Sequence, residues 1–289
     1  MRKTCVVTGA NRGIGFAVAR QLASAGHDVV LVCRDAVDGA RARDTLVAAG
    51  GSARMVHGSL ASLRAIRDTA RAIEGACPRL HVLIHNAGIW PSQRSLNEDG
   101  LEQAFVVNHL APFLLNRLLE PRLAEQRARV VQVSAGLYVK GAVDLARTPR
   151  GDDFSAFKTY ANAKLCNLLT LDHFAARWQP LGISVNALHP GVIRTGLGDR
   201  GDALGLLLRL VKRLWKTPEE GARPVVRLAV DPALEGVSGR YYELEQERPL
   251  QGHARDARLA RVVCEQAEQL CGLTPLQSSP HAASEAAAR

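Results

Sequence analysis

Short apolar runs rich in valine, isoleucine and leucine alternate along this chain with longer segments of helical length. The short β-branched runs predict strands, and the longer segments predict helices. Strands that alternate with helices predict βαβ units with right-handed crossovers, and therefore an α/β fold with one doubly wound parallel sheet and helices on both faces. The predicted strands cover 5–8, 29–33, 54–57, 82–85, 130–134 and 184–189, and the predicted helices cover 13–25, 38–49, 62–76, 101–125 and 157–178.

The pattern predicts a single hydrophobic core. No internal linker or repeat interrupts the alternation, so residues 1–274 are expected to form a single domain. Residues 275–289, PLQSSPHAASEAAAR, are small and polar, and we expect them to form a disordered tail because they cannot bury enough apolar surface.

A glycine-rich stretch follows the first predicted strand. Residues 8–15 read TGANRGIG, a G-x-x-x-G-x-G variant of the dinucleotide fingerprint, and a helix follows. Glycines allow a tight turn and let backbone N–H groups approach a pyrophosphate at the helix N-terminus. This strand–turn–helix context predicts a Rossmann-type sheet with a dinucleotide site. The predicted contacts are Gly9, Asn11, Arg12, Gly13, Ile14 and Gly15.

The end of the second strand bears on the choice of cofactor. Cys33 stands where an NAD-selective enzyme would place a carboxylate for the ribose hydroxyls, and Arg34 follows it. Two guanidiniums, from Arg12 and Arg34, would suit a 2′-phosphate through bidentate hydrogen bonds. The pattern predicts NADP(H); the alternative is a pair of solvated surface arginines.

The segment FKTYANAKLCNLL carries Tyr160 and Lys164, whose i, i+4 spacing places them on one helix face. A fixed ammonium beside a tyrosine stabilises the phenolate and lowers a pKa that is ordinarily near 10. Such a pair is suited to proton transfer. By itself, the YxxxK spacing is common by chance.

Five motifs occur in one order: TGANRGIG, HNAG at 85–88, VNHLAPF at 107–113, YANAK at 160–164 and HPGVIRT at 189–195. Together they resemble the short-chain dehydrogenase/reductase family over residues 3 to about 242. NHLAPF, GLYVKG, HPGVIRTGLG and EGVSGRYY are similar to the retinol-dehydrogenase-like branch, whose members often use NADP(H).

The resemblance implies a role for each matching position. Tyr160 would be the acid–base residue, Lys164 would bond the nicotinamide ribose, and Asn108 would hold a water in a proton relay behind Lys164. The glycines of the first loop would form the phosphate turn. The further implied cofactor contacts are Asn86, Ala87, Gly88, Pro190, Gly191, Val192, Ile193 and Thr195.

The chain departs from the family pattern at two places. Where the family has Asp-Leu after the third strand, contacting adenine, this chain has Ser59 and Leu60, which should weaken that contact without abolishing it. Where the family reads Ser-Ser after the fifth strand, this chain has Ser134 and Ala135, and an ungapped match puts the alanine at the position of the oxygen-polarising serine.

The sequence leaves open whether Ser134 or Ala135 faces the nicotinamide. If the alanine faces the nicotinamide, Ser134 faces away, because successive strand side chains point to opposite faces. Gly136 could let the backbone turn Ser134 inward, so Ser134 remains a candidate catalytic residue. Otherwise Tyr160, helped by a water or by Tyr138, must stabilise the developing alkoxide.

Residues 203–216, ALGLLLRLVKRLWK, form a predicted amphipathic helix. Because the segment after the HPG motif covers the substrate in this family, we expect a substrate lid near 196–217. A basic helix at a membrane surface and a plain packing helix are the alternatives. The helices at 101–125 and 157–178 are apolar on more than one face, which favours a homodimer.

Composition adds little to this picture. The net charge of +9 is spread along the whole chain, so we expect no nucleic-acid partner. Six cysteines without CxxC spacing predict reduced core thiols and no metal site. Many animal relatives carry an N-terminal membrane anchor; this chain shows no signal peptide and no apolar run of about 18 residues, so a cytoplasmic protein is expected.

The sequence therefore predicts an NADP(H)-dependent oxidoreductase that interconverts a carbonyl and an alcohol on an apolar small molecule. Two other classes remain because of Ala135. One is a non-redox member of the fold that carries out isomerisation, dehydration or cyclisation. The other is a catalytically weak regulator that binds NADPH.

Overall fold

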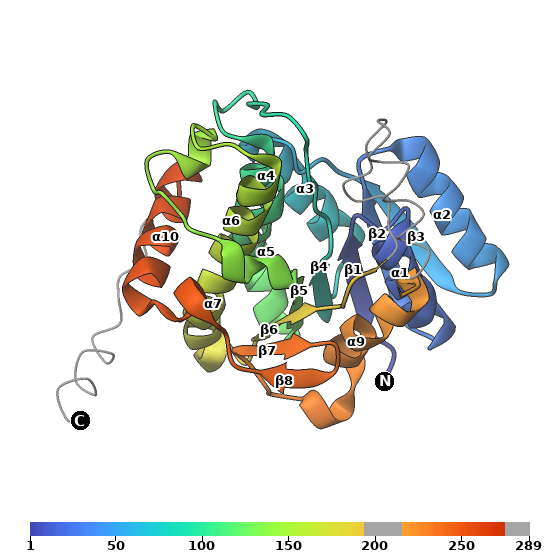
Figure 1. Cartoon of the computed structure of the whole chain (residues 1–289). Coiled ribbons are helices and arrows are strands. Elements are labelled where there is room, and N and C mark those ends of the chain that lie inside the picture. Colours follow the sequence, from blue (N-terminus) through green and yellow to red (C-terminus); the bar gives the residue numbers. More distant parts are fainter. Residues whose placement is uncertain (194–215, 275–289) are drawn as a thin grey trace.

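The computed structural model describes residues 1–193 and 216–274, and its centre is one eight-stranded sheet (Figure 1). The strand order is β3-β2-β1-β4-β5-β6-β7-β8, and every neighbouring pair is parallel except the antiparallel pair β7 and β8. The doubly wound α/β fold is confirmed, with one antiparallel strand added at an edge. The strands are β1 (Thr4–Thr8), β2 (Asp28–Cys33), β3 (Ser52–His57), β4 (Val82–His85), β5 (Arg129–Val133), β6 (Ser184–His189), β7 (Arg240–Glu243) and β8 (Gln246–Arg248).

Helices cover both faces of the sheet, and each face has its own core. Along β5 the side chains alternate, so that Val130 belongs to one core and Val131 to the other. The first face packs against α3 (Leu63–Ala76), α5 (Ala111–Glu125), α6 (Ala156–Leu169), α7 (Leu171–Trp178) and α10 (Ala257–Leu270); the second packs against α1 (Gly13–Ser24), α2 (Ala36–Ala48) and α9 (Pro218–Val230).

Two predicted helices are not continuous. The helix expected over 101–125 begins with the short α4 (Gln103–Phe105) and passes through a π-helical turn, Val106–Leu110, before α5. A π-turn inserts a residue into the helical repeat, and such turns are frequent at functional sites. The helix expected over 157–178 divides at Thr170, whose hydroxyl donates to the Asn167 carbonyl at 2.9 Å.

Four elements near the C-terminus were not predicted: α9, β7, β8 and α10. The interior of α9 contains a glycine and a proline, which lower intrinsic helix propensity. Its start carries a signal that the sequence analysis missed, because Thr217 and Glu220 form a reciprocal capping box. Strand β8 is three exposed polar residues, with no apolar alternation to reveal it.

The topology determines where a ligand can bind. From β1 the chain builds outward through β2 and β3, and then returns to place β4 on the other side of β1. The crevice at the carboxyl ends of β1 and β4 is the switch point at which doubly wound sheets bind ligands. Both the glycine loop after β1 and the HNAG motif at the end of β4 reach this crevice.

Within residues 1–193 and 216–274, every helix is too short or too polar to cross a lipid bilayer. All six cysteines are buried free thiols, as predicted. The expected tail at 275–289 lies outside the described residues.

Candidate functional site

The glycine loop is a closely packed turn. Gly9 and Gly13 have φ of +66° and +58°, a region that favours glycine. A Cβ added to Gly15 would lie 2.3 Å from the Gly9 carbonyl oxygen, so the helix could not approach the loop with any side chain there. The three glycines are thus each required by backbone conformation or by space.

The start of α1 has unsatisfied backbone donors. Its N-cap residue, Arg12, makes no side-chain capping hydrogen bond, whereas α2, α3, α6, α9 and α10 are each capped by an aspartate, serine or threonine. The first N–H groups of a helix need an acceptor, and the helix dipole favours an anion at that end. This donor set, beside three closely packed glycines, fits the pyrophosphate of a dinucleotide. Asn11 and Ile14 belong to the same turn and are partly exposed.

The HNAG motif braces the loop from the neighbouring strand. The Thr8 hydroxyl accepts from the backbone N–H groups of Asn86 and Ala87, at 3.1 Å each. The Asn86 side-chain amide donates to the carbonyls of Thr8 and Gly9, at 2.9 and 3.2 Å. Asn86 and Ala87 thereby hold the turn in place.

The predicted 2′-phosphate clamp lies at the end of β2. The Gly9 N–H donates to the Val32 carbonyl at 2.9 Å, so the glycine loop adjoins this strand end. Arg12 and Arg34 are exposed, and their guanidiniums make no hydrogen bond or ion pair within the described part of the chain. Both guanidiniums are therefore available to an external anion.

Ser59 and Leu60, which follow β3 by two and three residues, lie in different surroundings. The Ser59 hydroxyl accepts from the Ala61 N–H at 3.3 Å, and the serine is partly exposed. Leu60 is buried in the core on the α3 face. Of the two, Ser59 has the more accessible side chain for a contact with adenine.

Tyr160 and Lys164 lie together on α6, each 5% exposed. The Lys164 Nζ is 5.8 Å from the centre of the Tyr160 ring and donates to the Val133 carbonyl at 3.0 Å. Burial raises the pKa of Tyr160 and lowers the pKa of Lys164 to about 8. The expected lowering of the tyrosine pKa by the ammonium is therefore wrong for this structure, because desolvation of the phenolate dominates.

Asn108 sits in the π-helical turn. Its side-chain amide accepts from the Ile89 N–H at 2.8 Å and donates to the Ile89 carbonyl at 2.9 Å. A Cβ on Gly88 would lie 3.2 Å from the Asn108 Oδ1 and 3.8 Å from the Lys164 Nζ. Asn108 therefore holds the chain after β4 by both backbone groups and lies close to the tyrosine–lysine pair; the water relay implied for it stays a prediction.

In the structure Ser134 is buried, whereas the adjacent Ala135 is partly exposed. By alternation along β5, Ser134 points to the same side as Val130, toward the core beneath α5 and α6. It is 4% exposed, and its hydroxyl has no hydrogen-bond partner in the described residues. Ala135 continues in extended conformation, with φ of −146° and ψ of 143°, and is partly exposed. The methyl group, rather than the hydroxyl, occupies the exposed position.

Tyr138 is buried and its hydroxyl is engaged. It is 2% exposed, its hydroxyl accepts from the Gln251 N–H at 3.1 Å, and its ring packs edge-on against Tyr241. These contacts argue against the helper role considered for Tyr138, which stays untested.

Two residues near the site were missed from the sequence. Trp90 stacks on the ring of Tyr160, with ring centres 4.7 Å apart and planes 12° from parallel. His189, at the end of β6, lies against Gly136, where a Cβ would be 3.4 Å from its Nε2. Desolvation lowers the pKa of His189, and the nearby charge of Lys164 lowers it further. Trp90 is the second residue after the matched HNAG motif, and this position was the available signal.

The HPG segment begins at the carboxyl end of β6. Gly191 has φ of +93°, and a Cβ there would meet the Leu244 side chain at 3.0 Å. Pro190 and Ile193 are buried, whereas Val192 is 55% exposed. Thr195, and the lid predicted near 196–217 except for Lys216 and Thr217, lie outside the described residues.

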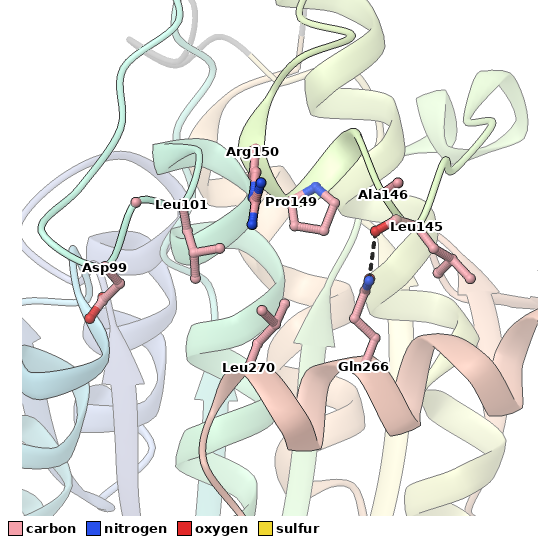
Figure 2. Close-up of a pocket in the computed structure, with 9 residues that line it drawn as sticks. Asp99, Leu101, Leu145, Ala146, Pro149, Arg150, Gln266 and Leu270 are labelled. Carbon is pink, nitrogen blue, oxygen red and sulfur yellow. Dashed lines mark hydrogen bonds between the residues drawn. The ribbon is translucent and has the colours of Figure 1, made fainter.

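A cavity of about 570 Å³ lies elsewhere, between α10 and the loops that precede α4 and α6 (Figure 2). Its walls include Leu101, Pro149 and Leu270, and Gln266 on α10 donates across it to the Leu145 carbonyl at 2.7 Å. It shares no lining residue with the predicted site.

A glycine turn at the switch point and a buried tyrosine–lysine pair on the helix beside it define a nicotinamide-dependent oxidoreductase with a Rossmann-type sheet. The family model of short chain dehydrogenases matches residues 3–202. The chain belongs to this family, and its curated relatives place it in the retinol-dehydrogenase-like branch.

Relatives resemble the chain over nearly its whole length. Retinol dehydrogenase 14 of Mus musculus is 36% identical, over 94% of this chain and 86% of the relative. Polyprenol dehydrogenase of Mus musculus is 37% identical, over 93% of this chain and 84% of the relative. A candidate gluconate 5-dehydrogenase of Beutenbergia cavernae, solved with NADP at low occupancy, aligns with a TM-score of 0.68 at 28% identity, over 84% of this chain and 95% of that one.

Proposed function

We propose that this protein is an NADP(H)-dependent oxidoreductase that interconverts a carbonyl and an alcohol on an apolar small molecule. The observation that carries the proposal is the buried Tyr160–Lys164 pair on α6, beside the braced glycine turn. A bound nicotinamide supplies or accepts the hydride. The protein's own residues orient the reactants, exclude water and move the proton.

The proton step is assigned to Tyr160. Its raised pKa keeps the phenol protonated at neutral pH, which suits a proton donor in carbonyl reduction. Donation leaves a phenolate, and the ammonium of Lys164 stabilises that charge from the same helix face. The pair therefore acts as a neutral acid backed by a cation.

Preference for NADP(H) is proposed from Arg12 and Arg34. Both are exposed and unpaired within the described residues, and neighbouring Cys33 carries no charge that would favour ribose hydroxyls instead. Burial raises the pKa of Cys33 to about 11, so its thiol stays neutral. Charged hydrogen bonds to a 2′-phosphate would then distinguish the two nicotinamide cofactors.

Arg34→Ala should weaken NADPH binding by about 1.5–3 kcal/mol, which is the usual range for hydrogen bonds to a charged group. The effect on NADH should be much smaller, because NADH lacks the phosphate. Calorimetric titration of both cofactors measures this difference. Arg41→Ala, an exposed arginine on α2, is the matched control and should change neither affinity. Equal losses of affinity for NADPH and NADH in the Arg34 variant would show that Arg34 does not bind the 2′-phosphate.

An apolar substrate is proposed from the residues near Tyr160. Trp90 covers its ring, and the large apolar side chains of Phe157 and Val192 are 47% and 55% exposed. Phe157 precedes Tyr160 by three residues on α6, so both lie on one side of the helix. Exposed apolar side chains on these two motif segments favour an apolar ligand. The relatives named for retinol and polyprenol agree with this class.

Carbonyl reduction should slow as the pH rises through about 8, where Lys164 loses its proton. Below that pH the ammonium is present to stabilise the phenolate; above it the lysine is neutral. An ordinary lysine, with a pKa near 10.4, would put this fall about two pH units higher. The measurement is kcat for reduction between pH 6 and 10. Lys164→Arg keeps the charge and should remove the fall from this range, even if its turnover is lower; a fall at the same pH in that variant would exclude Lys164 as its origin.

The proposed reaction itself is tested by following NADPH absorbance with a panel of apolar aldehydes and ketones. Consumption that produces the matching alcohol supports the reductase. Conversion of a substrate without net change in NADPH would establish the non-redox class instead, and binding without conversion of any substrate would establish the regulator.

A further inference from the structure

Trp90 connects two parts of the site that are far apart in sequence. Its indole ring stacks on Tyr160 at 4.7 Å and 12°. Its indole N–H donates to the carbonyl of Ala156, the first residue of α6, at 2.7 Å. Two different contacts, one through the ring face and one through a directed hydrogen bond, therefore join the indole to the helix that carries the tyrosine.

The backbone that presents the indole is itself held. Trp90 follows Ile89, whose N–H and carbonyl are both bonded to the Asn108 side chain. The tryptophan thus has little freedom to move relative to the π-helical turn on one side and α6 on the other. A flat, anchored ring against a second ring restricts rotation of the second about χ1 and χ2, because either rotation would break the stack.

We propose that Trp90 is a positioning residue that holds the Tyr160 phenol in the orientation needed for proton transfer and keeps water from one face of its ring. The inference rests on the proposed reaction, in which Tyr160 is the acid. It deepens that proposal by adding a residue that acts through the tyrosine.

Water exclusion gives the inference a readout that does not depend on turnover. Desolvation is what raises the pKa of Tyr160. Trp90 is uncharged, so its removal changes solvation and leaves the charges in place. The charged group that lies close to the ring is Lys164, on the same helix and 5.8 Å from the ring centre; His189, at the end of β6, interacts electrostatically with Glu243 and with Lys164.

The experiment compares Trp90→Ala, Trp90→Phe and Val47→Ala in the full chain. Selective ¹³C labelling of the tyrosine Cζ atoms gives one signal per tyrosine, and Tyr160→Phe identifies the signal of Tyr160. Trp90→Ala should move the Tyr160 titration down toward the ordinary value of about 10, because water reaches the exposed face. Trp90→Phe keeps an aromatic face and should retain most of the raised pKa. Val47→Ala shortens a half-exposed apolar side chain of α2, on the other face of the sheet, and should leave the titration unchanged.

Steady-state kinetics provide the second readout. With an apolar aldehyde that the wild-type protein reduces, Trp90→Ala should lower kcat by up to about 10²-fold, the usual effect of misplacing a reacting group by about 1 Å. Trp90→Phe should restore much of this loss, and the affinity for NADPH should be unchanged in both variants. If Trp90→Ala does not fold, Trp90→Leu, which also removes the aromatic ring, replaces it in both measurements.

An unchanged Tyr160 titration in Trp90→Ala would overturn the inference. A rise in KM with kcat unchanged would also overturn it, because Trp90 would then only line the substrate pocket. Failure of the proposed function is a separate result. If the wild-type protein reduces no carbonyl, the reaction is wrong, while the ¹³C titration still decides whether Trp90 controls the environment of Tyr160.

Discussion

Tyr160→Phe should lower the rate of NADPH-dependent carbonyl reduction by at least about 10²-fold, the usual contribution of a positioned acid–base group. The phenol is buried, protonated at neutral pH and close to the ammonium of Lys164, and phenylalanine keeps its shape but has no proton to donate. Stacking on Trp90 should be preserved, so the fold should be unaffected. Single-turnover oxidation of NADPH with a reducible apolar aldehyde measures the loss.

A second tyrosine offers a matched control for this substitution. Tyr138→Phe also removes a phenolic hydroxyl, but one that accepts from the Gln251 N–H in the core. It should reduce stability by about 0.5–1.5 kcal/mol, as for one lost hydrogen bond, and leave turnover nearly unchanged. Near-normal turnover in Tyr160→Phe, with NADPH binding intact, would show that the proton comes from another group and would favour a different reaction.

Ala135→Ser should raise the rate of reduction of a simple activated carbonyl. The methyl of Ala135 stands at the partly exposed position after β5, where the family places a hydroxyl. A lost donor to a developing oxyanion typically costs about 10²–10³-fold in rate, or 2.7–4 kcal/mol, and restoring one can recover part of that difference. The measurement is kcat/KM for one aldehyde in both proteins.

Ser134→Ala is the companion variant and should change turnover little. Its hydroxyl is buried and without a partner among the described residues, and an unsatisfied buried polar group costs about 1–3 kcal/mol. Its removal should therefore leave stability equal or slightly higher. A large loss of turnover in Ser134→Ala, with folding and NADPH binding intact, would show that Ser134 is the working hydroxyl and that the alternation argument fails here.

The fold was predictable where its signals are local. Each of the six predicted strands is present, within two residues at either end, because a β-branched run shows in its own sequence. The break at Thr170 and the π-turn around Asn108 were not predictable, since the apolar pattern of a helix continues through both. Strand β8 was missed because it depends on pairing with β7 and carries no apolar pattern.

Some features of the candidate site could likewise be predicted from local sequence, and others could not. The glycine spacing that begins at Gly9 and the i, i+4 pair Tyr160 and Lys164 are short-range patterns, and their geometry follows from one turn and one helix. The effect of burial on the two pKa values does not follow from spacing. It depends on how much water the surrounding layers exclude, and here exclusion raises the tyrosine pKa that the ammonium alone would lower.

By itself, the sequence determined the α/β class and the family, because the alternation of strands and helices and the order of the five motifs can be followed along the chain. It also predicted the phosphate turn and the acid–base pair, each of which lies within a few consecutive residues. Only the tertiary structure decided that Trp90 lies against Tyr160, that Asn108 holds Ile89, and that Ser134 points inward while Ala135 is exposed. These contacts join segments separated by many residues along the chain. They follow from how α6, the π-turn and the ends of β4 and β5 pack together, which no single stretch of sequence specifies.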